Sequence, residues 1–282
     1  MTEAHAIALY QGSLAMINWR DLSEAACRLL ADFVAKVVLR PVVEFFYSDP
    51  SAEFVQIVHD HSALASWQVG SADEARKAAA VGCDMIVAQG SEAGGHVRGT
   101  VATLPLVPAV VDAVSPTPVI AAGGIADGRG LAAVLALGAA GAWIGTRFLA
   151  SREATIHPRY RELVLGASEN DTIFAEELFD IRWPKAPHRV LRNKTVEAWE
   201  AAGRPASGKR PGEGEVIATS PTNGPVVRYQ SYTVSADTEG DIDALSLWAG
   251  QSVGLVSKVQ PAAEIVRDIA EEARLVLRRL AS

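Results

Sequence analysis

The segment from residue 85 to His96 holds the residues with the clearest chemical potential. A short apolar run, residues 85–88, passes directly into a glycine-rich loop that ends at His96. In a parallel α/β barrel the loops after the strands build the active face, so we expect His96 to lie there. Because histidine has an unperturbed pKa of about 6.5, its imidazole suits proton transfer. The alternative is a turn whose histidine merely hydrogen-bonds its own loop.

Glycines at this and two later strand ends indicate close contact with a ligand. Gly94 and Gly95 would let the backbone approach a flat ring system without interference from a Cβ atom. Further along, one apolar run ends in Gly123 and Gly124, and the next ends in Gly145. Free backbone N–H groups and the positive end of a helix dipole attract phosphate, which barrels commonly hold after their last two strands. Each glycine turn alone could be only a tight turn, but the two together predict a phosphate site.

Other residues that could do chemistry have simpler explanations. His59 and His61 are two residues apart, but zinc sites usually need three or four protein ligands and no further ligand follows at a useful spacing. We therefore predict no metal site. Cys27 and Cys83 are too isolated for a disulfide framework and are interpreted as reduced and packed. The remaining histidines are interpreted as surface or packing residues: His5, His157 and His188.

Two alternatives stay open at the sequence level. Trp67 and Gln68 lie near a strand end, where they could face a ligand, although a tryptophan there could equally fill the core. Arg147 follows the second glycine turn and could contact the phosphate or cap a helix.

The elements that position these residues are predicted from an alternation of short apolar runs and Ala-rich helical patterns, which begins at about residue 41. This alternation indicates βα units and a parallel sheet. Helices are predicted over residues 72–81, 106–114 and 131–137, with Gly82 and Gly138 as C-terminal caps and Asp127 as the cap of the third helix. The predicted strands are residues 42–46, 65–69, 85–88, 119–122 and 142–144.

These five strands are fewer than the eight of a closed barrel. Residues 1–40 could supply one strand, over residues 6–14, and a helix that Asp21 caps with Glu24 three residues later. We therefore predict an α/β fold, a TIM-type (β/α) barrel that is incomplete at the N-terminus, with a C-terminal helical lobe. Its predicted parts are an atypical segment (1–40), a barrel portion with the phosphate site (41–152) and a C-terminal lobe (153–282).

The C-terminal lobe has its own pattern. Helical patterns lie near residues 158–166 and 190–202, and a Gly-, Pro- and Ser-rich stretch over 203–225 is predicted as a long loop. Residues 261–280 have the proline start and apolar spacing of an amphipathic helix, which we expect to return and cover the barrel.

Composition narrows the class of protein. The chain has 282 residues, of which 49% are hydrophobic and 21% charged, as in globular proteins. A net charge of −7 leaves no basic surface to replace the counterions of a nucleic acid, so nucleic acid is not an expected partner. No apolar run reaches the roughly 20 residues that span a bilayer, and no export signal is recognisable, so we expect no membrane partner and a cytoplasmic location.

Four segments together resemble the nitronate monooxygenase family, formerly called 2-nitropropane dioxygenases, whose FMN-dependent enoyl reductase relatives share the fold. The resemblance runs from about residue 42 to the C-terminus, and the order of the segments makes it far more specific than a single glycine motif. The segments are QGSEAGGHVRG (89–99), PVIAAGGIADG (118–128), IGTRFL (144–149) and AGQSVGLV (249–256).

The resemblance implies a cofactor, FMN, and a role for each matching residue. His96 would be the active-site base or hydrogen-bond donor, with a small-molecule substrate and oxygen as the other reactants. The residues implied to bind FMN are Gln89 and Gly95 at the flavin, Gly123, Gly124, Gly145 and Thr146 at the phosphate, and Gln251 from the C-terminal part.

The chain departs from the family at its start. The family opens with a strand that ends in an Ala-Pro-Met type loop packed on the flavin, and residues 1–40 show no counterpart. Without those strands, the edges near Val42 and Ile144 are expected to be unpaired, unless dimerisation completes the sheet. Three functions are therefore weighed: oxygen-dependent oxidation of alkyl nitronates or nitroalkanes, NAD(P)H-dependent reduction of quinones or enoyl thioesters, and a catalytically impaired truncated member or binding protein.

Overall fold

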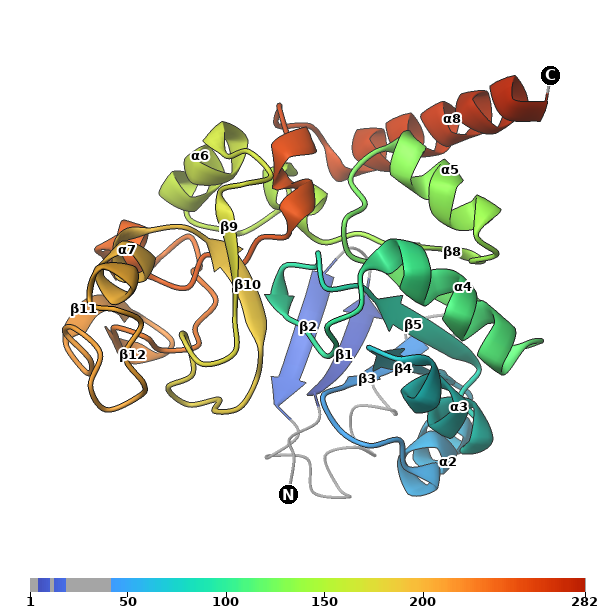
Figure 1. The fold of residues 1–282 in the computed structure, drawn as a ribbon, viewed down its shortest axis with the longest axis horizontal. Helices are drawn as coiled ribbons and strands as arrows, with labels where there is room; N and C mark the ends of the chain where they lie inside the picture. The colour runs from blue at the N-terminus through green and yellow to red at the C-terminus, as the bar shows by residue number, and fades with distance from the viewer. Residues whose placement is uncertain (1–4, 11–12, 19–41, 282) are drawn as a thin grey trace. The chain divides into compact units, whose positions relative to one another are not determined.

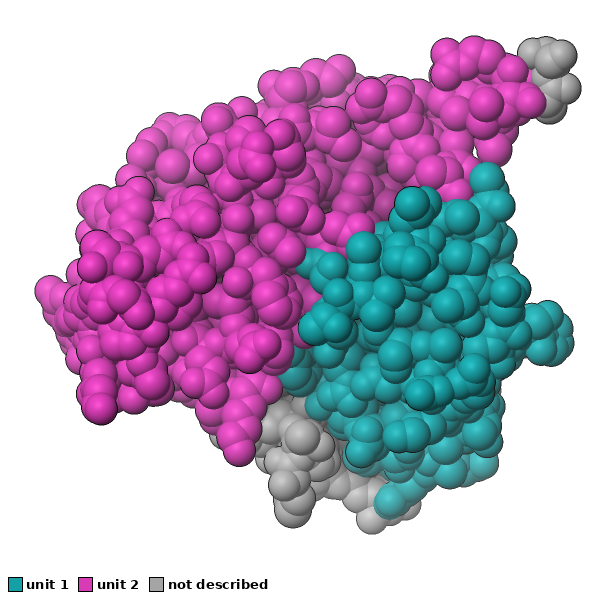
Figure 2. Space-filling model, viewed as in Figure 1, with its two compact units in different colours: residues 1–91, 98–122, 134–143 teal, residues 92–97, 123–133, 144–282 magenta. Residues whose placement is uncertain are grey.

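The computed structural model describes residues 5–10, 13–18 and 42–281, and Figure 1 shows its elements. The chain forms two compact units (Figure 2), and by residue number their segments alternate along the sequence. Unit 1 contains residues 1–91, 98–122 and 134–143, and unit 2 contains residues 92–97, 123–133 and 144–282. Helix α5 (Gly128–Ala136) has residues in both units.

Unit 1 is built on a seven-stranded sheet with the order β2-β1-β3-β4-β5-β7-β8. The five strands from β3 to β8 are parallel neighbours, and β1 and β2 are antiparallel. The strands are β1 (His5–Tyr10), β2 (Ser13–Asn18), β3 (Val42–Phe46), β4 (Leu64–Val69), β5 (Met85–Gln89), β7 (Val119–Ala122) and β8 (Gly141–Trp143). All five strands predicted after residue 41 are therefore confirmed, to within a residue at their ends.

The N-terminal prediction was wrong in its topology. Residues 6–14 were predicted as one strand, but β1 ends at Tyr10 and β2 runs back beside it, with Tyr10 opposite Ser13. Strand β1 also pairs with β3, with Ala8 opposite Val43, so the edge near Val42 is paired and not open. The helix predicted to start at Asp21 lies outside the described residues.

Three helices cover one face of the parallel strands: α2 (Ala52–Asp60), α3 (Ala72–Ala80) and α4 (Thr103–Val114). Under α2 the ring of Phe45 stacks on Phe54 and on Trp67, with ring centroids 5.7 Å and 4.7 Å apart. Trp67 is 1% exposed and its indole N–H donates to Ser48 O, so it fills the core of this layer. Gly82 and Gly138 have φ near +94°, which confirms them as left-handed helix caps.

The opposite face of the same strands carries polar side chains. The parallel register places Glu44 of β3 beside Ser66 of β4. Gln68 follows two residues after Ser66 and therefore lies on the same face of the sheet. Glu44 is 1% exposed and Ser66 is fully buried, and within the described part of the chain neither side chain has a hydrogen-bond partner. Burial without a partner raises the pKa of Glu44 to about 8, because the ionised carboxylate loses its hydration.

Unit 2 combines helices with two small antiparallel sheets. One sheet has the order β6-β10-β9 and the other the order β12-β11-β13. Its strands are β6 (Gly95–His96), β9 (Thr172–Ala175), β10 (His188–Leu191), β11 (Val216–Ser220), β12 (Gly224–Val227) and β13 (Glu239–Gly240). Its helices are α6 (Pro158–Gly166), α7 (Lys194–Ala201), α8 (Ala262–Ala281) and the 3-10 helices η2 (Thr146–Ala150), η3 (Ile242–Ala244) and η4 (Gln251–Leu255).

These elements confirm two predicted helices and correct two other segments. Helix α6 matches the predicted residues 158–166, and α8 matches the predicted C-terminal helix. The helix predicted over 190–202 is a strand, β10, followed by α7, because Asn193 caps α7 by accepting from the N–H groups of Thr195 and Val196. The loop predicted over 203–225 contains β11 and the start of β12.

Helix α8 packs against the start of α5. Ile265, Ile269 and Ala273 form its buried side, and a Cβ added at Gly128 would lie 2.4 Å from Ala273 N. The Gly128 N–H donates to the Glu272 carboxylate (2.7 Å), while Asp127 accepts from the N–H groups that follow it, as predicted for a cap. Among the described helices, none combines the length and the apolar character that a bilayer crossing requires.

Candidate active site

The loop that carries His96 is fixed to strand β10. Residues Gly95 and His96 form β6, in which His96 pairs with His188 and Gly95 pairs with Arg189. The next residue continues this contact, because the Val97 N–H donates to Pro187 O (2.8 Å). The predicted catalytic histidine thus stands on a short sheet rather than on a free loop.

A second anchor holds the same loop against residues 249–251. A Cβ added at Gly94 would lie 2.3 Å from Gly250 N and 2.4 Å from Ala249 C, so only glycine fits at this crossing. The Gln251 N–H donates to Glu92 O (2.9 Å). Gly94 had been expected to make room for a flat ring; the structure shows that it makes room for a neighbouring backbone.

The same crossing includes one of the predicted phosphate residues. The Thr146 hydroxyl accepts a hydrogen bond from the Gly250 N–H (3.0 Å). Three segments that are far apart in the sequence, around Glu92, Thr146 and Gln251, therefore meet within unit 2.

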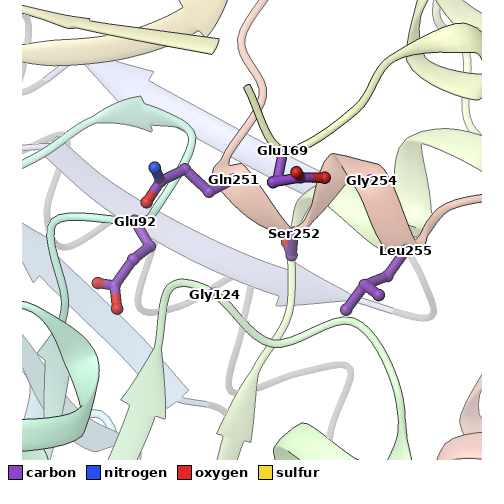
Figure 3. A pocket seen from close by; sticks show the side chains of 7 residues that line it. All are labelled: Glu92, Gly124, Glu169, Gln251, Ser252, Gly254 and Leu255. Carbon is purple, nitrogen blue, oxygen red and sulfur yellow. The ribbon is translucent and has the colours of Figure 1, made fainter. Parts of the chain in front are cut away.

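A cavity of about 350 Å³ opens beside this crossing (Figure 3). Two predicted cofactor residues, Gly124 and Gln251, lie in its wall, and Gly123 and Gly124 have φ of +94° and +74°. Figure 3 shows the Gln251 side chain extending toward the side of the cavity that carries Glu92. The lining consists of Glu92, Gly124, Glu169, Gln251, Ser252, Gly254 and Leu255.

The other predicted residues lie outside this lining. Gly145 is exposed at the start of η2, and a Cβ added there would meet no atom within 4 Å. Gln89 belongs to unit 1, where its side-chain oxygen accepts from the Arg98 N–H (2.9 Å). Arg147 donates to Gln260 (2.6 Å) and to Lys258 O, so its guanidinium fixes the segment before α8.

Aromatic rings surround His96. Its ring centroid lies 3.8 Å from Trp183 and 5.1 Å from Trp248, and that of His188 is 6.0 Å away. His188 is fully buried, and its Nε2 must be an acceptor because the Phe179 N–H donates to it (3.0 Å). The His188 Nδ1–H then donates to Ala186 O (2.9 Å), and burial lowers the pKa of His188. His188 is therefore a neutral packing residue, as predicted, beside the candidate base.

The charges at the cavity are mostly acidic. The carboxylates of Glu92 and Glu169 both line it. Arg189, on β10 opposite Gly95, lies within electrostatic reach of Glu92: burial lowers the pKa of Arg189, and the charge of Glu92 acts in the opposite direction. Glu92 lies inside the family-like segment 89–99, whereas nothing in the sequence pointed to Glu169 as a site residue.

The histidines weighed as a metal pair have other partners. His59 Nε2 lies 2.8 Å from Asp84, and His61 Nδ1 lies 2.7 Å from Ile57 O. In the described part of the chain, no three His, Cys, Asp or Glu side chains gather in a way that could hold a metal ion.

Comparison with known proteins identifies the family. The family model described as nitronate monooxygenase matches residues 19–272. The chain belongs to the nitronate monooxygenase family. It is 39% identical, over 223 residues, to a protein of Mycobacterium tuberculosis named as a monooxygenase; the match covers 79% of this chain and 56% of that protein. The chain thus spans little more than half the length of this relative.

Two further similarities bear on fold and chemistry. A hydroxy-methyl-oxo-octahydro-indene-carboxyl-CoA dehydrogenase of Rhodococcus jostii is 33% identical over 277 residues, which is 90% of this chain and 75% of that protein. The solved structure of a nitroalkane oxidase from Streptomyces ansochromogenes matches with a TM-score of 0.71 and 27% identity, over 91% of this chain and 69% of that one. The fold class is the TIM-type α/β barrel of this family, as predicted.

Proposed function

We propose that this member of the nitronate monooxygenase family oxidises alkyl nitronates or nitroalkanes with FMN and oxygen. The observation that carries the proposal is the convergence, in unit 2, of residues from all four family-like segments on one crossing and one cavity, with Gly124 and Gln251 in the wall. The family model and the likeness to a nitroalkane oxidase support the same chemistry.

In this proposal the uncharged groups at the cavity bind the phosphate of FMN. Gly124 presents backbone without a side chain, Ser252 a hydroxyl and Gln251 an amide, and such groups can hydrogen-bond an anion. The carboxylates of Glu92 and Glu169 oppose an anion, and Arg189 offsets the first of them. Gly123, Gly145, Thr146 and Gln251 would complete the binding, with Gly95 and Gln89 along the flavin ring.

In the proposed mechanism the protein positions the substrate and moves a proton. FMN, when bound, supplies the redox chemistry and the reaction with oxygen. A nitronate already lacks the α-proton, so it needs no base. A neutral nitroalkane must first lose that proton to an imidazole nitrogen of His96, which the β6–β10 pairing and the neighbouring rings hold in place.

One observation favours a second candidate function. The dehydrogenase relative acts on a CoA thioester, as its name states, and it covers 90% of this chain. A flavin-dependent reductase of enoyl thioesters or quinones would use the same cofactor site with NAD(P)H as the electron donor. Reduction of the bound flavin by NAD(P)H without a nitro compound would favour this alternative. Cytoplasmic location and a homodimer stay predictions from the sequence.

The role of His96 is tested by His96→Ala. We expect turnover of a neutral nitroalkane to fall about 10²- to 10⁴-fold, the usual contribution of a general base, while the flavin absorbance and the turnover of preformed nitronate are largely kept. His59→Ala, at a histidine that pairs with Asp84 in unit 1, is the matched control. Wild-type nitroalkane turnover in His96→Ala would remove His96 from the mechanism.

A further inference from the structure

Among the ring contacts of His96 with described residues, the one with Trp183 is the closest. Their centroids are 3.8 Å apart and their planes differ by 35°, so the indole lies over the imidazole. Trp183 is 9% exposed. A histidine ring has a broad and roughly two-fold preference about χ2, so a flat neighbour at this distance restricts how far the ring can turn.

The turn that carries Trp183 has an unusual backbone. Arg182 and Lys185, which flank Trp183 and Pro184, have φ of +75° and +58°. Non-glycine residues seldom adopt this left-handed region, and two so close together are costly to hold. The Trp183 N–H donates to Asp180 O (3.0 Å), which closes the turn.

A buried arginine side chain stabilises this turn by hydrogen bonds. The Arg210 side chain is fully buried and donates to the Asp180 carboxylate (2.6 Å) and to Leu178 O (2.8 Å). Its guanidinium also lies over the ring of Tyr229, 4.5 Å from the centroid. Residue Ile181 is held as well, because its N–H donates to Tyr229 O (3.1 Å). The strained turn is therefore fixed by contacts that do not involve His96.

Trp248 makes the second ring contact with His96. Its carbonyl accepts the hydroxyl hydrogen of Tyr160, and its backbone bridges to Val190 on β10. With centroids 5.1 Å apart, its indole touches His96 less closely than Trp183 does. The two indoles come from different segments of unit 2, and both are held by backbone contacts of their own.

From these contacts we infer that Trp183 is a positioning residue, which the braced turn at residues 181–185 presses against His96 to hold the imidazole in its reactive orientation. The inference rests on the proposed function for its effect on turnover, but the contact itself can be tested without it. Proton transfer requires the base within hydrogen-bond reach of the substrate, so a freely turning ring would lose rate rather than substrate affinity.

The test compares Trp183→Leu and Trp183→Phe with Trp199→Phe as control. Trp199 lies on α7, where its indole N–H donates to Pro205 O. The first readout is NMR of protein with isotope-labelled histidine, in which the His96 ring signal is assigned by its loss in His96→Asn. Stacking on Trp183 should displace this signal through the ring current. The second readout is kcat and KM for a neutral nitroalkane and for its nitronate.

We expect the His96 signal to move toward that of a free histidine in Trp183→Leu and to stay near wild type in Trp199→Phe. For the neutral nitroalkane, kcat should fall about tenfold in Trp183→Leu with KM nearly unchanged, and Trp183→Phe should restore most of it. An unmoved His96 signal in Trp183→Leu would overturn the inference, as would wild-type kcat. If the wild-type enzyme oxidises no nitro compound, the proposed function fails, while the NMR result still decides whether Trp183 stacks on His96.

Discussion

At the scale of single residues, Glu44 is expected to make stability depend on pH. Its pKa of about 8 in the folded protein lies above the usual value of 4.5, so between these values the folded state keeps a proton that the unfolded state has released. Stability should therefore fall as pH rises through this window, by up to about 1.4 kcal/mol per pH unit. Glu44→Gln cannot ionise and should show a flatter dependence.

Urea unfolding at several pH values within the window measures this difference. Glu271→Gln, at an exposed glutamate of α8, should keep the wild-type slope. Equal slopes in wild type and Glu44→Gln would show that Glu44 is already ionised in the folded protein.

Single residues also mark the limits of prediction from sequence. His96 and Gly124 were chosen because glycine-rich strand ends have few physical uses, and Gln251 was chosen from the family resemblance alone. Glu169 at the cavity and Trp183 beside His96 carried no such signal, since each reaches its place through tertiary packing of a lobe whose strands were not foreseen. The open alternative for Trp67 was decided by its stacking on Phe45, which depends on α2.

At the scale of elements, the His96 loop can cross residues 249–251 only because Gly94 has no side chain. Gly94→Ala would place a Cβ 2.3 Å from Gly250 N, so one backbone must move. We expect a loss of about 1–3 kcal/mol in the free energy of unfolding, together with weaker FMN binding, because Gln251 moves with the crossing. Thermal unfolding and a flavin titration would measure both.

Gly166→Ala, near the end of α6, is the matched control because a Cβ there meets no atom within 4 Å. It should leave FMN binding unchanged and stability equal or slightly higher. Equal behaviour of the two alanine variants would contradict the close approach at Gly94.

A helix cap gives a second element-scale prediction. Asn193 accepts from the N–H groups of Thr195 and Val196, and its amide donates to Leu245 O (2.6 Å). Asn193→Ala should lower the free energy of unfolding by about 1–2 kcal/mol. Asn193→Asp keeps the cap acceptor but loses the donor, so its loss should be smaller. Chemical denaturation of both variants measures the difference, and a neutral Asn193→Ala would contradict the capping role.

The elements also show where sequence patterns work. The five parallel strands were predictable because strands covered on both faces form continuous apolar runs. The β1–β2 hairpin and the strands between residues 188 and 227 were missed or misassigned, because short strands in mixed polar surroundings have no comparable pattern. From the sequence, Asn193 was placed inside one long helix. In the structure it is the N-cap of α7, which begins shortly after β10 ends.

For the whole molecule, the proposed phosphate site predicts a difference between two flavins. A ligand that binds only the folded state stabilises it by about 2.7 kcal/mol when present at 100 times its Kd. FMN should therefore raise the unfolding temperature more than riboflavin does at the same concentration, because riboflavin has no phosphate for the cavity beside Gly124. Thermal unfolding with each flavin measures this, and equal shifts would argue against phosphate recognition there.

The alternation of the two units along the chain affects how the protein is made. Unit 1 ends at residue 143, about halfway through the chain, whereas unit 2 takes most of its residues from the second half. On the ribosome, the segments 92–97 and 123–133 therefore emerge well before their partners around Ala249 and Glu272 have been translated. The segment that carries His96 can therefore complete these contacts only after the C-terminal third has been translated, so a chain released early would lack the assembled candidate site.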